Sequence, residues 1–129
     1  MLTTKVEVNF QDGIFKTPLG LVQDKNVTLA EVLRNYNSQD VLLFDLRTRR
    51  EYEDYHVPGS ILLPLEELET RYKEIPKNKT VYLICRTGNR TAQAMRYLLT
   101  RGYRKAYNVL NGIVEWEGPL EGDMEDIAS

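Results

Sequence analysis

The chain has 129 residues, of which 42% are hydrophobic and 28% are charged, and its formal net charge is −2. This length suits one domain, and the composition predicts a packed core. The near-neutral charge argues against a nucleic-acid binder, which needs a concentrated basic face. No apolar run approaches the roughly 20 residues that cross a bilayer, and "MLTTKVEVNF" lacks a signal-peptide core. One cysteine and one histidine exclude an internal disulfide and a cysteine-rich zinc site. We therefore expect a cytoplasmic protein in a reducing compartment, where a free thiol persists.

Residues 1–26 form the first segment, and no function is assigned to it. "VEVNF" alternates apolar and polar residues, "DG" is a turn signal, and "IFKT" follows. This pattern is compatible with a short hairpin and equally with an extended arm lying on the domain.

A helix is predicted after Thr28. Thr28 and Glu31 form a capping-box pattern, in which the threonine begins the helix and the glutamate follows three residues later. The helical period then places four side chains on one buried face: Leu29, Val32, Leu33 and Tyr36.

The next elements alternate between strands and helices. "VLLFDL" at residues 41–46 is a nearly continuous apolar run, typical of a strand buried on both faces of a parallel sheet. Thr48 and Glu51 repeat the capping-box pattern and predict a short helix, and "HVPGS" predicts a turn. "ILLP" predicts a brief strand. An amphipathic helix after Pro64 would bury four side chains: Leu65, Leu68, Tyr72 and Ile75.

The last part of the chain continues this alternation. "VYLIC" at residues 81–85 predicts a second buried strand, and residues 91–101 predict a helix that Gly102 ends. "AYNVL" predicts a strand, "GIVEWEG" a final helical turn whose Trp116 packs in the core, and residues 118–129 an acidic, frayed tail. The alternation predicts a single α/β domain with a mainly parallel central sheet flanked by helices on both faces. Sites in such sheets lie at the carboxyl ends of strands, where Cys85 lies.

The residues after Cys85 favour a reactive thiolate. A tight turn between a strand and a helix gathers backbone N–H groups into an anion-binding nest, and the helix N-terminus adds partial positive charge. Gly88 permits a positive φ, and Arg86 and Arg90 add two cations. These features favour a nucleophile, although most lone cysteines are small buried hydrophobes. Ile84 precedes the cysteine where some thiolate enzymes have a histidine, so His56 is a base only if the fold brings it to Cys85.

Four segments resemble a rhodanese-homology domain of the single-domain sulfurtransferase type. They are "VTLAEVLRN", "VLLFDLRTRREYEDYHVPGSILLPLEEL", "VYLICRTGNRTAQAMRYLLTRGY" and "YNVLNGIVEW", which follow one another within residues 27–117. Asn111 departs from the frequent glycine before Gly112, and asparagine tolerates a left-handed backbone.

The resemblance implies a role for particular residues. Cys85 would accept sulfane sulfur from a small anionic donor such as thiosulfate and pass it to cyanide, a thiol or a protein acceptor, without a cofactor or metal. Asp45, Arg47 and His56 would support the active-site loop structurally. Five residues would form the loop that binds the substrate: Arg86, Thr87, Gly88, Asn89 and Arg90.

Two other functions stay open at this point. Four residues separate Cys85 from Arg90, whereas phosphatases on this fold place five, so phosphatase activity is the lesser alternative. A non-catalytic regulatory or partner-docking module is the other, because the first 26 residues and the acidic tail are potential docking elements. Neither a nucleic acid nor a membrane is expected as a partner. A persulfide on the single cysteine would need an external acceptor.

Overall fold

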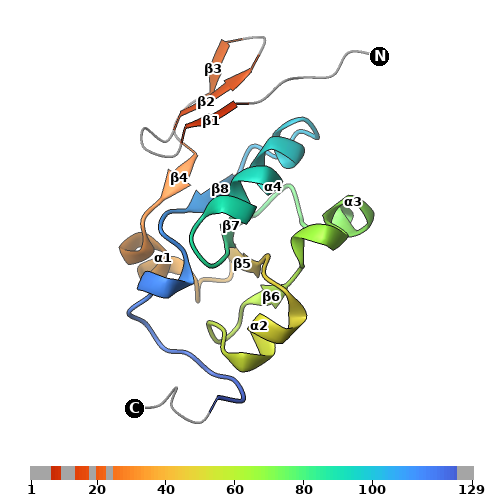
Figure 1. The fold of residues 1–129 in the computed structure, drawn as a ribbon. Helices are drawn as coiled ribbons and strands as arrows, with labels where there is room; N and C mark the ends of the chain where they lie inside the picture. Colours follow the sequence, from red (N-terminus) through yellow and green to blue (C-terminus); the bar gives the residue numbers. More distant parts are fainter. Residues whose placement is uncertain (1–6, 10–13, 18–19, 23–24, 125–129) are drawn as a thin grey trace.

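A five-stranded parallel sheet forms the centre of the domain. The computed structural model describes residues 7–9, 14–17, 20–22 and 25–124. Every pair of neighbouring strands in the sheet is parallel, as the long apolar runs predict. In spatial order the strands are β4 (Asn26–Val27), β8 (Ala106–Val109), β7 (Thr80–Ile84), β5 (Val41–Asp45) and β6 (Ile61–Leu62) (Figure 1).

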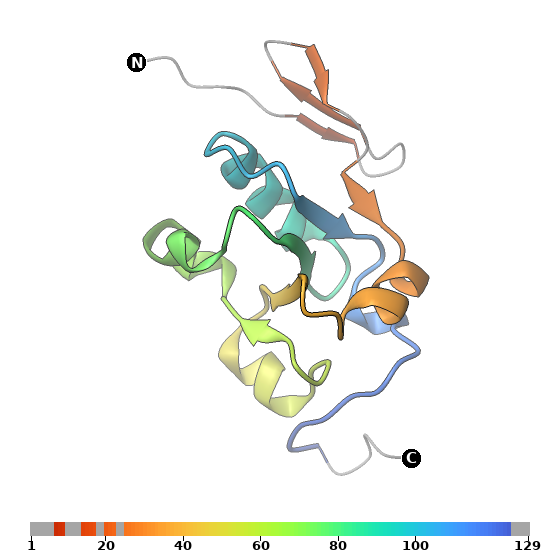
Figure 2. The same ribbon diagram turned by 180° about the vertical axis from the view of Figure 1, so that it is seen from behind.

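Helices cover both faces of this sheet, so the predicted fold class is confirmed. α1 and the η3 turn lie together on one side, and α3 and α4 lie on the other (Figures 1 and 2). No helix within the described ranges is long and apolar enough to cross a membrane. The α-helices are α1 (Leu29–Asn35), α2 (Arg49–Asp54), α3 (Leu68–Arg71) and α4 (Asn89–Leu99); the 3₁₀ turns are η1 (Leu65–Glu67), η2 (Tyr72–Glu74) and η3 (Ile113–Glu115).

Strand β7 joins two hydrophobic cores. Val81 and Leu83 pack in the core under α4, and Tyr82 and Ile84 pack in the core under α1 and η3. Successive side chains of a strand point to opposite faces, so a strand covered on both sides must be apolar throughout. Trp116 packs in the second core, as predicted. Cys85 therefore follows directly after the carboxyl end of a central strand that is packed on both faces.

Both predicted capping threonines begin helices. The Thr28 hydroxyl accepts the Glu31 N–H at 3.1 Å, and Thr48 forms a complete capping box with Glu51. The predicted buried face of α1 is wrong at one position, because Leu33 is 43% exposed while its neighbour Val32 is fully buried. With only seven residues, α1 turns too few side chains toward the sheet to bury all four predicted positions.

The single amphipathic helix predicted after Pro64 is wrong. The segment divides into η1, α3 and η2, although Leu68 and Ile75 are buried as expected. The Tyr103 hydroxyl lies 2.9 Å from the Tyr72 carbonyl oxygen and 2.8 Å from that of Ile75. Residue 76 is a proline, which disfavours a helical Ile75 and has no N–H for the Tyr72 carbonyl, so the Tyr103 hydroxyl supplies a donor there.

The first strands of the chain form a separate antiparallel sheet. β1 (Glu7–Asn9) pairs with β2 (Ile14–Thr17), as the hairpin alternative predicts, and β3 (Gly20–Val22) adds a third strand. The "DG" turn between β1 and β2 lies outside the described residues.

The C-terminal segment is not frayed through residue 124, contrary to the prediction. His56 and Glu121 exchange backbone hydrogen bonds of 2.8 and 2.9 Å as an antiparallel bridge. The Asp123 N–H donates to the Glu53 carbonyl, and the Met124 N–H donates to the Asp54 carbonyl. Residues 121–124 therefore lie along the end of α2, held by backbone bonds that side-chain composition does not reveal.

Candidate functional site

Cys85 lies directly after β7, at the carboxyl edge of the sheet, and is 1% exposed. Its sulfur accepts the Gly88 N–H at 3.1 Å. A hydrogen bond from a backbone N–H to sulfur strengthens when the sulfur carries negative charge. The loop therefore presents a backbone donor to the sulfur, and a reactive thiolate at Cys85 stays a prediction.

Gly88 turns the loop into α4. It is the N-cap of the helix and has φ +106°, a left-handed value that glycine adopts without strain. The first N–H groups of a helix lack intrahelical partners, and the helix dipole is positive at that end. The start of α4 thus contributes partial positive charge beside Cys85. The helix begins at Asn89, two residues earlier than predicted.

The segment before η3 holds the loop from the other side. The Ile113 N–H donates to the Cys85 carbonyl at 2.8 Å, and the Val114 N–H donates to the Arg86 carbonyl at 3.3 Å. Gly112, at φ +72°, comes so close that a Cβ there would lie 2.2 Å from the Arg86 carbonyl oxygen. Asn111 has φ 69°, the left-handed conformation that asparagine tolerates.

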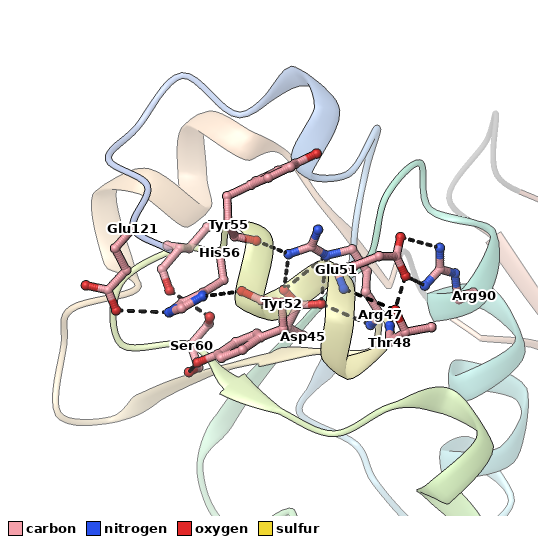
Figure 3. Close-up of polar contacts among 11 residues, drawn as sticks. Asp45, Arg47, Thr48, Glu51, Tyr52, Tyr55, His56, Ser60, Arg90 and Glu121 are labelled. Carbon is pink, nitrogen blue, oxygen red and sulfur yellow. Dashed lines mark hydrogen bonds and ion pairs between the residues drawn. The ribbon is translucent and has the colours of Figure 1, made fainter. Parts of the chain in front are cut away.

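Arg90 is bound by a carboxylate from another helix. Its Nη1 and Nη2 donate to the two Glu51 carboxylate oxygens at 2.6 and 2.9 Å, and the same carboxylate accepts the Thr48 N–H (Figure 3). The Arg90 hydrogen bonds lower the pKa of Glu51 to about 2, and Glu51 in turn raises the pKa of Arg90. Glu51 therefore serves the capping box, as predicted, and also ties α2 to the start of α4.

The other polar loop side chains face outward. Arg86, Thr87 and Asn89 are exposed, and among the described residues their side chains have no hydrogen bond or ion pair. Among the described residues Arg86, which follows Cys85 in the chain, is thus an exposed and unpaired cation, whereas the charge of Arg90 is balanced by Glu51.

Asp45 and Arg47 form a buried ion pair beside the site. Asp45 ends β5 in register with Ile84, so it lies next to the end of β7. Its carboxylate accepts the Arg47 backbone N–H, Nε and Nη2, and Arg47 Nη2 also donates to the Tyr55 carbonyl at 2.6 Å. Both side chains are fully enclosed, and their bonds join the end of the sheet to the end of α2 (Figure 3).

His56 lies at the opposite end of α2 from Arg90 (Figure 3). Its Nδ1 is 2.6 Å from the Tyr52 carbonyl oxygen and its Nε2 is 2.9 Å from a Glu121 carboxylate oxygen. The ring stacks on Tyr52 with centroids 3.7 Å apart. Both ring nitrogens therefore have partners other than Cys85, and the fold does not form a cysteine–histidine pair.

Thr91 and Asn108 are polar residues of the site that sequence reasoning missed. The Thr91 hydroxyl oxygen is 3.5 Å from the Cys85 sulfur and contacts the Asn108 side-chain oxygen on β8. Both residues are completely buried. The sequence signal that could have found them is a polar residue at a position predicted to be buried, in "TAQAM" and in "AYNVL".

Together the fold and the site define a single-domain α/β protein with a buried cysteine in a loop at the carboxyl edge of its parallel sheet. The family model "Rhodanese-like domain" matches residues 28–119. The chain belongs to this family.

Individual relatives agree with this assignment. A protein named "Sulfurtransferase" from Allochromatium vinosum is 39% identical over 62% of this chain and 75% of its own length. "Putative sulfur carrier protein YrkF" from Bacillus subtilis is 35% identical over 66% of this chain, and the match spans 46% of that relative's length. A crystal structure of a rhodanese-related protein from Thermoplasma volcanium superimposes with a TM-score of 0.70 at 25% identity, covering 77% of this chain and 99% of that one. The chemistry that these relatives share in their names is the handling of sulfur.

Proposed function

We propose that the protein is a sulfurtransferase that carries sulfane sulfur from a small anionic donor, such as thiosulfate, on Cys85 to a thiol, cyanide or a protein acceptor. The observation that carries the proposal is the 3.1 Å bond from the Gly88 N–H to the Cys85 sulfur in a buried loop at a helix N-terminus. Such a loop stabilises both a thiolate and the anionic persulfide that it becomes.

The reaction has two displacement steps. In the first, the Cys85 thiolate attacks the outer sulfur of thiosulfate; a new S–S bond forms, the original S–S bond breaks, and sulfite leaves with its electron pair. In the second, cyanide or an acceptor thiolate attacks the terminal sulfur, and the Cys85 thiolate is released. The first step extends the reactive group by one S–S bond of about 2 Å, which helps an acceptor to reach a cysteine that is 1% exposed.

The loop residues have separate roles in these steps. The Gly88 N–H holds the attacking sulfur, and the unpaired Arg86 attracts the dianionic donor. Arg90 presents its remaining N–H groups from a position that Glu51 fixes. Asp45, Arg47 and His56 support the surrounding backbone and do not touch the sulfur. No second cysteine is present to take the sulfur, so the acceptor comes from outside the chain.

Intact-mass measurement tests the proposal. Incubation with thiosulfate should add one sulfur atom to the protein, and cyanide or a thiol should remove it. The Cys85→Ala variant is the matched control and should gain nothing. Failure of the wild-type protein to gain a removable sulfur would contradict the proposal and favour a docking role, whereas aryl-phosphate turnover equal to thiosulfate turnover would revive the phosphatase alternative.

A further inference from the structure

Behind Cys85 runs a chain of neutral polar side chains that ends at the edge of the sheet. The Thr91 hydroxyl follows the cysteine sulfur, Asn108 on β8 follows Thr91, and the Asn108 amide nitrogen donates to the Asn26 side-chain oxygen on β4 at 3.0 Å. Cys85, Thr91 and Asn108 are all buried. The chain therefore links the reactive sulfur to a strand two positions away in the sheet.

The Thr91 hydroxyl has one proton and three neighbouring acceptors. Its oxygen lies 3.0 Å from the Gly88 carbonyl, 3.5 Å from the Cys85 sulfur and within hydrogen-bond distance of the Asn108 side-chain oxygen. The Gly88 carbonyl also accepts the Ala92 N–H at 3.2 Å, so it keeps a hydrogen-bond donor when the Thr91 hydroxyl donates elsewhere. The choice for the hydroxyl proton is therefore between Asn108 and the sulfur.

The direction of the hydrogen bonds in this chain depends on the charge of the sulfur. When Cys85 is a thiol, its S–H can donate to Thr91, Thr91 donates to Asn108, and Asn108 donates to Asn26; the structure shows the last two of these bonds in this direction. When Cys85 is an anion, the strongest arrangement has Thr91 donating to sulfur. The Asn108 amide then has to turn over so that its nitrogen donates to Thr91, and the Asn26 amide has to turn with it so that its nitrogen donates to the Asn108 oxygen.

Charged groups around the sulfur do not supply this second hydrogen bond. On α4, Arg90 is paired with Glu51 of α2, and in the loop Arg86 is exposed. At the end of β5, Asp45 is fully engaged by Arg47. On the side of Cys85 that faces Thr91, β8 contributes the neutral Asn108 amide, which contacts the Thr91 hydroxyl and the Asn26 side chain.

We propose that Thr91 is a positioning residue for the reactive sulfur, and that Asn108 lets it donate its proton to the anionic form of Cys85. Thr91 thereby gives the thiolate a second hydrogen bond besides the one from Gly88. The assignment deepens the proposed sulfur transfer and rests on it for its biological purpose, but the hydrogen-bond switch itself is a property of the free thiol.

Alkylation of Cys85 by iodoacetamide as a function of pH tests the switch without any sulfur donor. Only the thiolate reacts, so the rate at a pH well below the midpoint of the wild-type profile, divided by the rate on the alkaline plateau, reports the thiolate fraction. The Thr91→Val variant keeps the shape and removes the hydroxyl, and its ratio should fall about tenfold, the effect of losing one hydrogen bond to a charged atom. Thr91→Ser restores the hydroxyl and should stay within about twofold of the wild type.

A second variant tests the role of Asn108. Asn108→Asp places an acceptor-only carboxylate beside Thr91, so the hydroxyl proton stays on that side and the ratio should also fall at least tenfold. The plateau rate checks that each variant is folded and its thiol accessible. An unchanged ratio in Thr91→Val would overturn the proposal, and an unchanged ratio in Asn108→Asp would overturn the part played by the amide. Sulfur loading is measured separately by intact mass. If the alkylation ratios of the variants fall as expected but the wild-type protein gains no sulfur, only the proposed function is contradicted.

Discussion

Replacement of Gly112 by alanine should disrupt the contact between the closing segment and the active-site loop. At φ +72° and ψ −172° Gly112 lies in a backbone region that is essentially restricted to glycine, so a residue with a Cβ there costs about 1–3 kcal/mol. The added Cβ would also lie 2.2 Å from the Arg86 carbonyl oxygen and 2.7 Å from that of Cys85, both backbone atoms. Relief of this overlap moves the segment away at a further cost of about 1–3 kcal/mol. The free energy of unfolding should therefore fall by about 2–6 kcal/mol.

Gly59→Ala is the matched control. Gly59 also has a left-handed φ, +85°, but a Cβ there would have no neighbour within 4 Å. This variant should lose only the conformational part, about 1–2 kcal/mol. The difference between the two variants reports the steric overlap together with the extra backbone strain at Gly112.

Urea denaturation of both variants measures these losses, because the unfolding free energy falls linearly with denaturant. Sulfur loading adds a functional measurement. Displacement of the closing segment breaks the bonds from Ile113 to Cys85 and from Val114 to Arg86, so Gly112→Ala should load sulfur at least tenfold more slowly than Gly59→Ala. Equal destabilisation and equal loading rates in the two variants would refute the reasoning.

Three further changes test other contacts of the site. Arg47→Met leaves the Asp45 carboxylate buried without its cation and should lower the unfolding free energy by about 3–5 kcal/mol in urea titrations; a loss below about 1 kcal/mol would contradict the assigned pairing. Arg90 lowers the Glu51 pKa from 4.5 to about 2. The ion pair therefore stabilises the fold fully above pH 4.5, and this stabilisation disappears as the pH falls toward 2. Glu51→Gln should therefore flatten stability against pH in that window, and an unchanged profile would show that the pair contributes nothing. His56→Phe keeps the ring stack but loses both ring hydrogen bonds, so thermal unfolding should occur at lower temperature while sulfur loading stays within about twofold; a loading defect above tenfold would restore His56 as an acid–base group.

The fold could be predicted largely from local patterns. The apolar runs that became β5 and β7, the capping threonines Thr28 and Thr48, and the position of Cys85 after a strand each depend on residues close together in the chain. Patterns failed where tertiary bonds intervened. Tyr103 bonds to two carbonyl groups at the end of the segment predicted as one helix, and His56 held Glu121 in a segment that its composition marked as frayed.

The site divides in the same way. "CRTGNR" predicted a glycine in a left-handed turn beside the sulfur, and Gly88 has φ +106° and donates its N–H to Cys85. The same letters presented Arg90 as a cation for substrate, yet its partner is Glu51, 39 residues earlier. Thr91 and Asn108 also meet only because α4 packs against β8.

The sequence by itself determined most of the elements, the edge of the sheet that carries the thiol, and the glycine turn beside it. These depend on backbone preferences and hydrophobic periodicity, which act over a few residues. Only the tertiary structure decided which charges are balanced, where the single histidine points, and what lies behind the sulfur. Those outcomes depend on strand order and helix packing, which bring distant residues within hydrogen-bond distance and which no local pattern encodes.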